Sequence, residues 1–312
     1  MARKFATLVM AVLAAGAVQA RELTWSYVIP AAANKAGLNG TDWHTDLTIY
    51  NPQNHTLPIV MQFMPAGRDN SGRLPTIEFD VYAWETLNLW DVLGPKGFNQ
   101  RGQTGAIWVR VDELKRSCSG TAVECHFALT SRTYTLNPSG GAGEYGQATP
   151  GFPTNLPMVD GYMTYLPQLM DDKDFRTNAG LVSLTDGFVT VRFDLQKPNG
   201  DIIHTRDVLV PPYGQTQWRL DRSVTGGTLA AYIVGGPSTA AVVPYASVVN
   251  NVTGDAVYVE AHMTTVGYPT PAAQVASAAT RGVSEFPGRE IVPGTVVERQ
   301  QRERALTAPS LD

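Results

Sequence analysis

Charged residues and cysteines are scarce in this chain of 312 residues. Only 17% of the residues are Asp, Glu, Lys or Arg, and there are two cysteines, whereas about 25% charged residues is usual in soluble domains. Together with a hydrophobic content of 43%, this composition excludes a disordered, highly charged polymer. The net charge of −4 at pH 7 offers no basic surface for a nucleic-acid backbone. We therefore expect a globular protein that does not bind nucleic acid.

Long apolar runs are also missing. No stretch reaches the ~18 consecutive apolar residues expected of a membrane-spanning helix, so the sequence predicts no membrane span. Residues 1–20 contain Arg3 and Lys4, then an uncharged stretch from Phe5 to Val18, and end at Ala20. This order of a basic, an apolar and a small-residue region is typical of a cleavable signal peptide. We therefore expect an exported protein, periplasmic or extracellular.

The two cysteines are Cys118 and Cys125, and His126 follows the second. A structural zinc site requires about four Cys or His ligands, and no further ligand lies nearby in the sequence. In the oxidising compartment that export implies, a disulfide between the two cysteines is the better interpretation. The spacing predicts a local bond that holds one excursion of the chain, with no metal site.

Helical periodicity is nearly absent, and short runs rich in Val, Ile, Thr, Tyr and Phe alternate with turn clusters, which is typical of antiparallel strands. In Val189–Leu195 the apolar residues alternate strictly with polar ones. The alternation predicts one buried face and places Thr190, Arg192 and Asp194 in water. The following Asn199-Gly200 pair predicts a hairpin with a primed turn.

Six segments recur in the same order in the second half of the chain, which indicates an internal duplication. The matched pairs are Tyr27–Pro30 with Tyr165–Pro167, Trp43–Ile49 with Phe175–Leu181, Ile59–Phe63 with Val189–Phe193, Thr76–Val81 with Thr205–Val210, Ala106–Val109 with Ala230–Ile233, and Ala128–Tyr134 with Val242–Val248. The excursion Asp112–Glu124, which contains Cys118 and ends directly before Cys125, stands where the second copy has a short hairpin.

Each copy supplies about seven short strands, which points to an all-β protein of two tandem immunoglobulin-like or fibronectin-like antiparallel β-sandwiches. The expected organisation is a signal peptide at 1–20, a first sandwich at 21–158, a second at 159–265 and a flexible, disordered tail at 266–312. Within the tail, Val297–Leu306 is compatible with a short helix. A single jelly roll made from the whole chain is the alternative fold, and the duplication argues against it.

The chain resembles uncharacterised exported bacterial proteins with tandem Ig-like sandwich domains. The resemblance rests on a "Y-x-x-P-A" at Tyr27–Ala31, a "W-x-T-D-L-x-I-x-N-P" at Trp43–Pro52, an "S-R-T-Y" at Ser131–Tyr134 and a "Y-G-Q" at Tyr145–Gln147. It covers most of residues 25–262. It implies the fold and the export, and it implies no activity.

Motifs for catalysis or for a cofactor are lacking. The five histidines are scattered singly, and the chain contains neither H-E-x-x-H, nor a nucleophile elbow, nor a phosphate-binding loop. His44 and Asp46 suggest a base and its orienting group. The duplicate, however, has Arg176 and Asn178 at the matching places, which favours a structural role. We expect no cofactor and a binding protein rather than an enzyme.

An acidic cluster leaves one question open. Asp171, Asp172 and Asp174, with Asp160, offer several oxygens to Ca²⁺, which takes 6–8 such ligands. The loop lacks the ligand spacing of an EF-hand, so a solvated acidic turn is the alternative interpretation.

The aromatic residues carry the binding hypothesis. Trp84 and Tyr213 lie at matched turns, where we expect them to be exposed and to contact a ligand. The predicted function is that of a non-catalytic exported binding or surface-structural protein, with a protein or polysaccharide of the cell envelope or extracellular space as partner. The alternative is a carbohydrate-binding or carbohydrate-active protein that uses exposed aromatics. The ligand, the oligomeric state and the role of the tail do not follow from the sequence.

Overall fold

The computed structural model describes residues 23–37, 40–116, 123–137, 140–264 and 287–292. Within these ranges the regular structure consists of strands, apart from the short 3₁₀ turn η2 (Val123–Cys125). The prediction of an antiparallel all-β protein is confirmed, and no helix in the described part of the chain is long and apolar enough to cross a membrane. The predicted signal peptide, Cys118 and the segment Val297–Leu306 lie outside the described residues.

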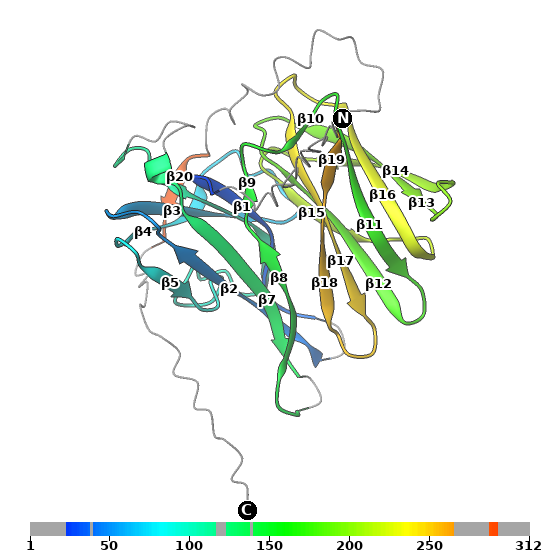
Figure 1. Cartoon of the computed structure of the whole chain (residues 1–312), viewed down its shortest axis with the longest axis horizontal. Helices are drawn as coiled ribbons and strands as arrows, with labels where there is room; N and C mark the ends of the chain where they lie inside the picture. The colour runs from blue at the N-terminus through cyan, green and yellow to red at the C-terminus, as the bar shows by residue number, and fades with distance from the viewer. Residues whose placement is uncertain (1–22, 38–39, 117–122, 138–139, 265–286, 293–312) are drawn as a thin grey trace, which may run out of the picture.

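Among the described residues, nine strands lie in the first half, ten lie in the second, and a last strand follows residue 286. Figure 1 shows their arrangement. The strands are β1 (Ser26–Ala36), β2 (Asp42–Tyr50), β3 (Leu57–Pro65), β4 (Leu74–Val81), β5 (Thr86–Leu89), β6 (Gln103–Val111), β7 (Ala128–Leu136), β8 (Glu144–Pro150), β9 (Phe152–Pro153), β10 (Met158–Val159), β11 (Met163–Asp171), β12 (Phe175–Ser183), β13 (Val189–Gln196), β14 (Ile202–Val210), β15 (Gln215–Arg219), β16 (Val224–Gly235), β17 (Ala241–Asn250), β18 (Ala256–Glu260), β19 (His262–Thr264) and β20 (Arg289–Ile291).

The pairing order of the strands repeats between the two halves. In the first half the order β4-β3-β6-β1 continues through β1 into β2-β7-β8, and β5 pairs with β2. In the second half the orders β14-β13-β16-β11 and β15-β12-β17-β18 belong to two separate sheets. Apart from the pairing of β1 with β2, which has no counterpart between β11 and β12, the pairings among β1–β8 match those among β11–β18. The six recurring sequence segments lie on equivalent strands.

Strand β1 connects the two parts of the first-half sheet. Its pairing with β6 shifts register between Ile29 and Ala32, and its last residues, Lys35 and Ala36, pair with β2. Such a bulge bends a strand. The bulge lies beside Ala31, Ala32 and Ala33 of β1, which face the junction between the two halves.

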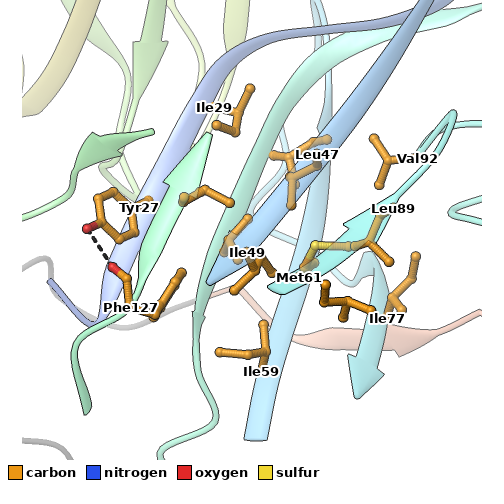
Figure 2. Close-up of a cluster of buried hydrophobic side chains, with 14 of the residues drawn as sticks. Tyr27, Ile29, Leu47, Ile49, Ile59, Met61, Ile77, Leu89, Val92 and Phe127 are labelled. Carbon is orange, nitrogen blue, oxygen red and sulfur yellow. Dashed lines mark hydrogen bonds between the residues drawn. The ribbon is translucent and has the colours of Figure 1, made fainter. Parts of the chain in front are cut away.

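Each half has its own apolar core. Figure 2 shows part of the first, in which Leu47 and Ile49 from β2 lie against Ile59 and Met61 from β3. The hydroxyl of Tyr27, also in this core, donates a hydrogen bond of 2.8 Å to the carbonyl oxygen of Phe127. In the second half, Val189, Val191, Phe193 and Leu195 are buried as their alternation predicts.

Two details of that strand differ from the prediction. Asp194 is buried rather than solvated, because its carboxylate accepts hydrogen bonds from Thr205 and Tyr232 on the neighbouring strands. The hairpin after it has a single residue with positive φ, Gly200 at 90°, whereas a primed turn of type I′ needs two. Hydrogen bonds from Gly200 N to Lys197 O and from Lys197 N to Asp201 O close this wider loop instead.

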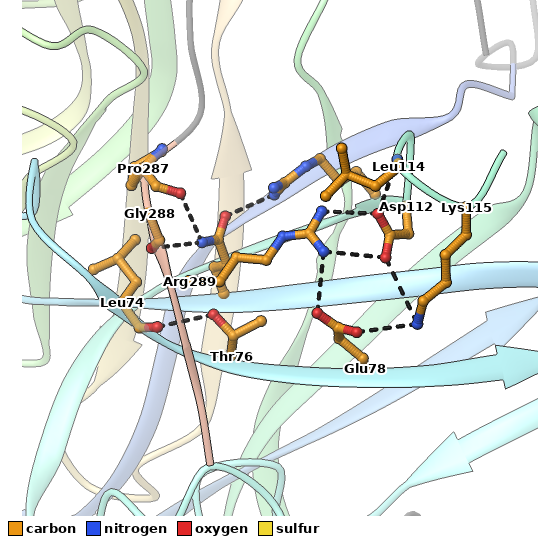
Figure 3. Close-up of polar contacts among 11 residues, drawn as sticks. Leu74, Thr76, Glu78, Asp112, Leu114, Lys115, Pro287, Gly288 and Arg289 are labelled. Carbon is orange, nitrogen blue, oxygen red and sulfur yellow. Dashed lines mark hydrogen bonds and ion pairs between the residues drawn. The ribbon is translucent and has the colours of Figure 1, made fainter. Parts of the chain in front are cut away.

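The expectation of a disordered tail is wrong for residues 287–292. These residues return to the first half, where β20 runs parallel to the edge strand β4. Figure 3 shows the cause: Arg289 donates to Asp112 at 2.8 and 3.1 Å and to Glu78 at 3.0 Å. The side-chain amide of Gln62 donates to the carbonyl oxygens of Pro287 and Gly288. The segment therefore continues the sheet.

The two halves share a third buried cluster at their junction. It joins five first-half residues to six second-half residues: Val28, Met64, Leu74, Ala106 and Trp108, with Val182, Leu184, Tyr213, Ala241, Val243 and Tyr245. Backbone bonds reinforce this contact, since Gly67 N donates to Gln215 O at 2.8 Å and Asn70 N donates to Pro212 O at 2.9 Å. The halves are thus packed against each other.

Candidate ligand site between the two halves

Trp84 and Tyr213, the predicted binding residues, have the same backbone conformation and opposite environments. Their φ angles are 63° and 47°, both in the left-handed region, as expected for equivalent turns. Trp84 is 62% exposed, but Tyr213 is only 2% exposed. The expectation of an exposed Tyr213 is therefore wrong, because its ring packs 6.0 Å from that of Trp108 in the buried junction. The two residues do not form one binding surface.

Of the two cysteines in the predicted disulfide, the structure describes Cys125. Cys125 is fully buried at the end of η2, within the first-half core. Cys118 lies outside the described residues. The pairing of the two cysteines stays a prediction.

The acidic cluster at Asp171, Asp172 and Asp174 uses its carboxylates for the protein's own groups. Asp171 pairs with Arg219 at 3.0 Å and accepts from the backbone N–H of Thr177. Asp172 accepts from the backbone N–H groups of Asp174 and Phe175, as in an Asx turn. Within the described ranges, no group of three or more His, Cys, Asp or Glu side chains could hold a metal ion.

His44 does not act together with Asp46. Its Nδ1 lies 3.1 Å from Asp91 Oδ1, and its Nε2 lies 3.3 Å from Asp42 Oδ2. Burial lowers the pKa of His44, but the hydrogen bonds and charges of Asp91 and Asp42 outweigh it and raise the pKa above its usual value. Asp46 instead accepts from the backbone N–H of Asp91. An imidazole with a carboxylate on each nitrogen links neighbouring segments and is not placed to act as a base.

A cavity of about 190 Å³ lies between the two halves. Its second-half wall is one face of the sheet β15-β12-β17, on which alternate residues of each strand point the same way. Those lining residues are Arg176 and Asn178 from β12, Gln215 and Gln217 from β15, and Tyr245, Ser247 and Val249 from β17. This wall is mostly polar, with Gln217 exposed and with Arg176 and Asn178 half-buried.

The first-half wall is built largely from small side chains. Ala31, Ala32 and Ala33 come from the bulged part of β1, and Gly105 comes from β6. A Cβ at Gly105 would lie 2.2 Å from the carbonyl oxygen of Met64, so the close approach of the strands requires glycine there. Trp43, Thr104, Thr133 and Gln147 complete the wall. The cavity exists because small residues stand at the junction.

Tyr245 organises the polar wall. Its ring lies over Gly180, where a Cβ would come within 2.1 Å of the ring. Its hydroxyl accepts from the side-chain amide of Gln215 and donates to Gln217 Oε1 at 3.0 Å. Gln215 is 2% exposed, and its Oε1 has no hydrogen-bond partner among the described residues. A buried acceptor without a donor costs about 1–3 kcal/mol, and this one belongs to a residue that lines the cavity.

The charge in the cavity has one sign. Arg176 is the ionised residue of the wall, and neither a carboxylate nor a histidine is among the described residues that line it. Arg176 Nη1 donates to Asn251 Oδ1 at 2.9 Å. Burial lowers the pKa of Arg176, and repulsion from Arg219 lowers it further, against the opposing effect of Asp171. The cavity thus combines one cation, four side-chain amides and several hydroxyls.

A second hollow of about 500 Å³ lies beside the first, between β8 and β18. Gln147 and Ala256 line both hollows. At this place Ser247 Oγ donates to Gln147 Oε1 at 2.8 Å, which links the two halves. The ring of Tyr258, which lines the outer hollow, is stacked on that of Tyr245 at 6.2 Å. The two hollows thus meet at Gln147 and Ala256.

This site was not predicted from the sequence, although four short sequence segments point to it. Each of the four segments that carry the family resemblance contributes one residue to the cavity wall: Ala31, Trp43, Thr133 and Gln147. Only the folded arrangement shows that these four segments surround one cavity. The second-half residues gave no such indication, because the match of Arg176 with His44 says nothing about the surface that Arg176 lines.

Comparisons with known proteins do not identify the chain. No protein-family profile matches it, and no curated protein matches it. Among solved structures, a β-glucuronidase 2 from Bacteroides uniformis, covalently bound to cyclophellitol-6-carboxylate aziridine, is 11% identical. That match covers 72% of this chain and 26% of the enzyme, with a TM-score of 0.15. A similarity of this size supports no conclusion about the fold or the activity.

Proposed function

We propose that this protein is an exported, non-catalytic binding protein built from two duplicated Ig-like domains, which hold a hydroxyl-bearing ligand in the cavity between them. The observation that carries the proposal is the lining of the cavity, where four side-chain amides, several hydroxyls and Arg176 gather between the two halves. The surrounding amides and hydroxyls suit a ligand with several polar groups.

The duplicated Ig-like description is supported by the repeated pairing order of the strands. Each copy has seven or more strands in antiparallel order, and each has a core of its own. Two packed antiparallel sheets of this size are typical of Ig-like sandwiches. A surface formed where two such units meet is a common place for ligand sites.

Binding is favoured over cleavage of the same ligand. Glycoside cleavage usually requires a pair of carboxyl groups about 5–9.5 Å apart, and no Asp or Glu is among the described residues of the cavity wall. Trp43, which is half-buried, provides an aromatic ring of the kind on which sugars stack. The alternative of a carbohydrate-binding protein therefore fits within the proposal, with Trp43 in place of the pair Trp84 and Tyr213.

A cavity-filling substitution tests the proposal. In Ala31→Leu the larger side chain occupies space beside β1, so we expect loss of binding to neutral and acidic sugars screened by saturation-transfer NMR. Ala36→Leu, at the exposed end of the same strand, is the matched control and should bind as the unsubstituted protein does. Equal binding by both variants would contradict the site.

A further inference from the structure

We propose that this protein associates head to tail with further copies of itself. The turn that carries Trp84 in one molecule docks on the outer face of the sheet β14-β13-β16-β11 in the next. The proposal goes beyond the proposed function, since it concerns neither the cavity nor its ligand. It follows from the repeat, because the second half makes the corresponding contact with the first half inside each molecule.

The turns that carry Trp84 and Tyr213 are equivalent in their backbone hydrogen bonds. The N–H of Trp84 donates to the carbonyl oxygen of Gln53, and the N–H of Tyr213 donates to that of Thr185. Both residues have a positive φ angle, so they are counterparts in conformation as well as in position. Two further backbone bonds match in the same way: Asn51 N to Glu85 O with Ser183 N to Gly214 O, and Glu85 N to Tyr82 O with Gly214 N to Pro211 O.

The strands beside the two turns extend this equivalence. In the second half, Tyr213 is buried in the junction together with Val182 and Val243, which are cross-strand partners on β12 and β17. The corresponding partners on β2 and β7 are Tyr50 and Ala128. Tyr50 is exposed and Ala128 is half-buried, whereas both valines are fully buried. The first half therefore presents to solvent the surface by which the second half is bound.

The backbone conformation of Trp84 is explained by such a contact. A residue other than glycine is uncommon in the left-handed region. For Tyr213 the packing of the junction stabilises this conformation, since the ring lies 6.0 Å from that of Trp108. Trp84 adopts the same conformation although 62% of it is exposed. An unfavourable backbone conformation at an exposed residue is typical of functional surfaces, and tryptophan is enriched at the centres of protein interfaces.

The partner surface is the second-half counterpart of the sheet face that covers Tyr213. In the first half this face presents Trp108 from β6 and its cross-strand partner Val28 from β1. The matching segment of β16 places Tyr232 where β6 has Trp108, and the partner of Tyr232 on β11 is Met163. Tyr232 and Met163 are half-buried. The contact of a tryptophan with a tyrosine would thus recur between molecules with the two residue types exchanged.

The outer face of the same sheet carries exposed apolar side chains. Val208 and Val210 of β14 belong to the second core, so Leu209 between them points outward. Leu209 is exposed, as are Val234 of β16 and Phe188 directly before β13. Exposed apolar side chains that lie together on one face mark a site of protein contact.

The two surfaces lie on opposite sides of the molecule. Figure 1 shows β13 and β14 on one side and β5, which begins two residues after Trp84, on the other. The two surfaces of one molecule therefore cannot meet each other. A contact between unlike surfaces of identical chains leaves one surface of each kind available at the ends of the assembly, so it extends into a chain of molecules.

The experiment measures self-association of the chain without its predicted signal peptide. Sedimentation velocity is recorded from about 1 μM to about 1 mM protein, a range in which weak contacts become populated. We expect the average sedimentation coefficient to rise steadily with concentration. Trp84→Ser should weaken the association about tenfold or more, as the loss of a central interface tryptophan does. Val252→Ser removes an exposed apolar side chain from the turn between β17 and β18. It is the control and should associate as the unsubstituted protein does.

A second variant, Leu209→Asp, tests the direction of the contact. Alone, neither Trp84→Ser nor Leu209→Asp should associate as the unsubstituted protein does. In an equal mixture, the intact Trp84 turn of one variant meets the intact β14 face of the other. The mixture should therefore form a dimer and nothing larger. If the contact is instead a symmetric one between two Trp84 turns, Leu209→Asp alone still dimerises, and the proposal is wrong.

The remaining outcomes also decide the matter. Thermal unfolding of each variant at low concentration shows that it is folded. A protein that stays monomeric over the whole concentration range, or a Trp84→Ser variant that associates normally, would overturn the proposal. Trp84 is not among the residues that line the cavity, so ligand binding there should be the same in Trp84→Ser. The proposed function and the head-to-tail contact can therefore fail separately.

Discussion

At the scale of single residues, two side chains with similar backbone conformations differ in their exposure to solvent. Trp84 and Tyr213 both occupy the left-handed region, where a residue other than glycine is uncommon. One side chain points to solvent, and the other fills the junction between the halves. Both residues have an unfavourable backbone conformation, but only Tyr213 is part of a packed interior.

This difference predicts unequal effects of truncation. Tyr213→Ala removes a buried ring from the junction and should lower the free energy of unfolding by about 3–5 kcal/mol. Trp84→Ala removes an exposed ring and should change it by less than about 0.5 kcal/mol. Urea denaturation followed by fluorescence measures both values. Similar losses in the two variants would show that Tyr213 is not buried in the folded protein.

His44 predicts a dependence of stability on pH. Its pKa in the folded protein is raised above the ordinary value of 6.5 for histidine, so the contacts of the imidazolium with Asp91 and Asp42 stabilise the fold fully below that value. Their contribution is lost as the pH rises through the folded pKa. His44→Gln should therefore destabilise the protein at about pH 5.5 and have a smaller effect at about pH 8.5. A penalty that grows with pH would contradict the assigned contacts.

At the scale of secondary-structure elements, the strands were predictable and their side-chain environments were less so. Alternation identified the buried face of β13, because a half-buried strand repeats every two residues. It failed at Asp194, since hydrogen bonds from two neighbouring strands make burial of that carboxylate tolerable. It also gave no sign of β20, a strand of three residues beside Pro287 and Gly288. Its partner β4 lies more than 200 residues earlier in the chain, beyond the reach of any local pattern.

The ion pairs of β20 predict a large effect of one substitution. Arg289→Gln leaves Asp112, whose side chain is 1% exposed, with Lys115 at 3.7 Å as its remaining cation. The free energy of unfolding should fall by about 2–3 kcal/mol. Arg192→Gln breaks an exposed pair with Asp207 and serves as the control, with little expected change. If Arg289→Gln leaves the midpoint of urea unfolding unchanged, then β20 does not stabilise the sheet edge at β4.

At the scale of the whole molecule, the repeated order of the strands was predictable from the sequence and the site was not. Six recurring segments indicated the repeat because packing residues recur where strands recur. The cavity depends on how one unit meets the other: small residues of β1 face the polar side of β12, β15 and β17. Those surfaces are formed by different strands in the two halves, so a comparison of matched positions cannot bring them together. For the same reason the sequence predicts an exposed Tyr213, although this residue is buried.

The return of β20 to the first half also bears on the order in which the chain is made. Synthesis proceeds from the N-terminus, so β4 is complete long before residues 287–292 exist. During that interval the edge of the first sheet is open, and an open edge is a template for pairing with other chains. The segment that covers it is added only after the entire second half. The sheet of the first half is therefore completed last. A chain that is truncated within the second half lacks β20 and has an unprotected edge at β4.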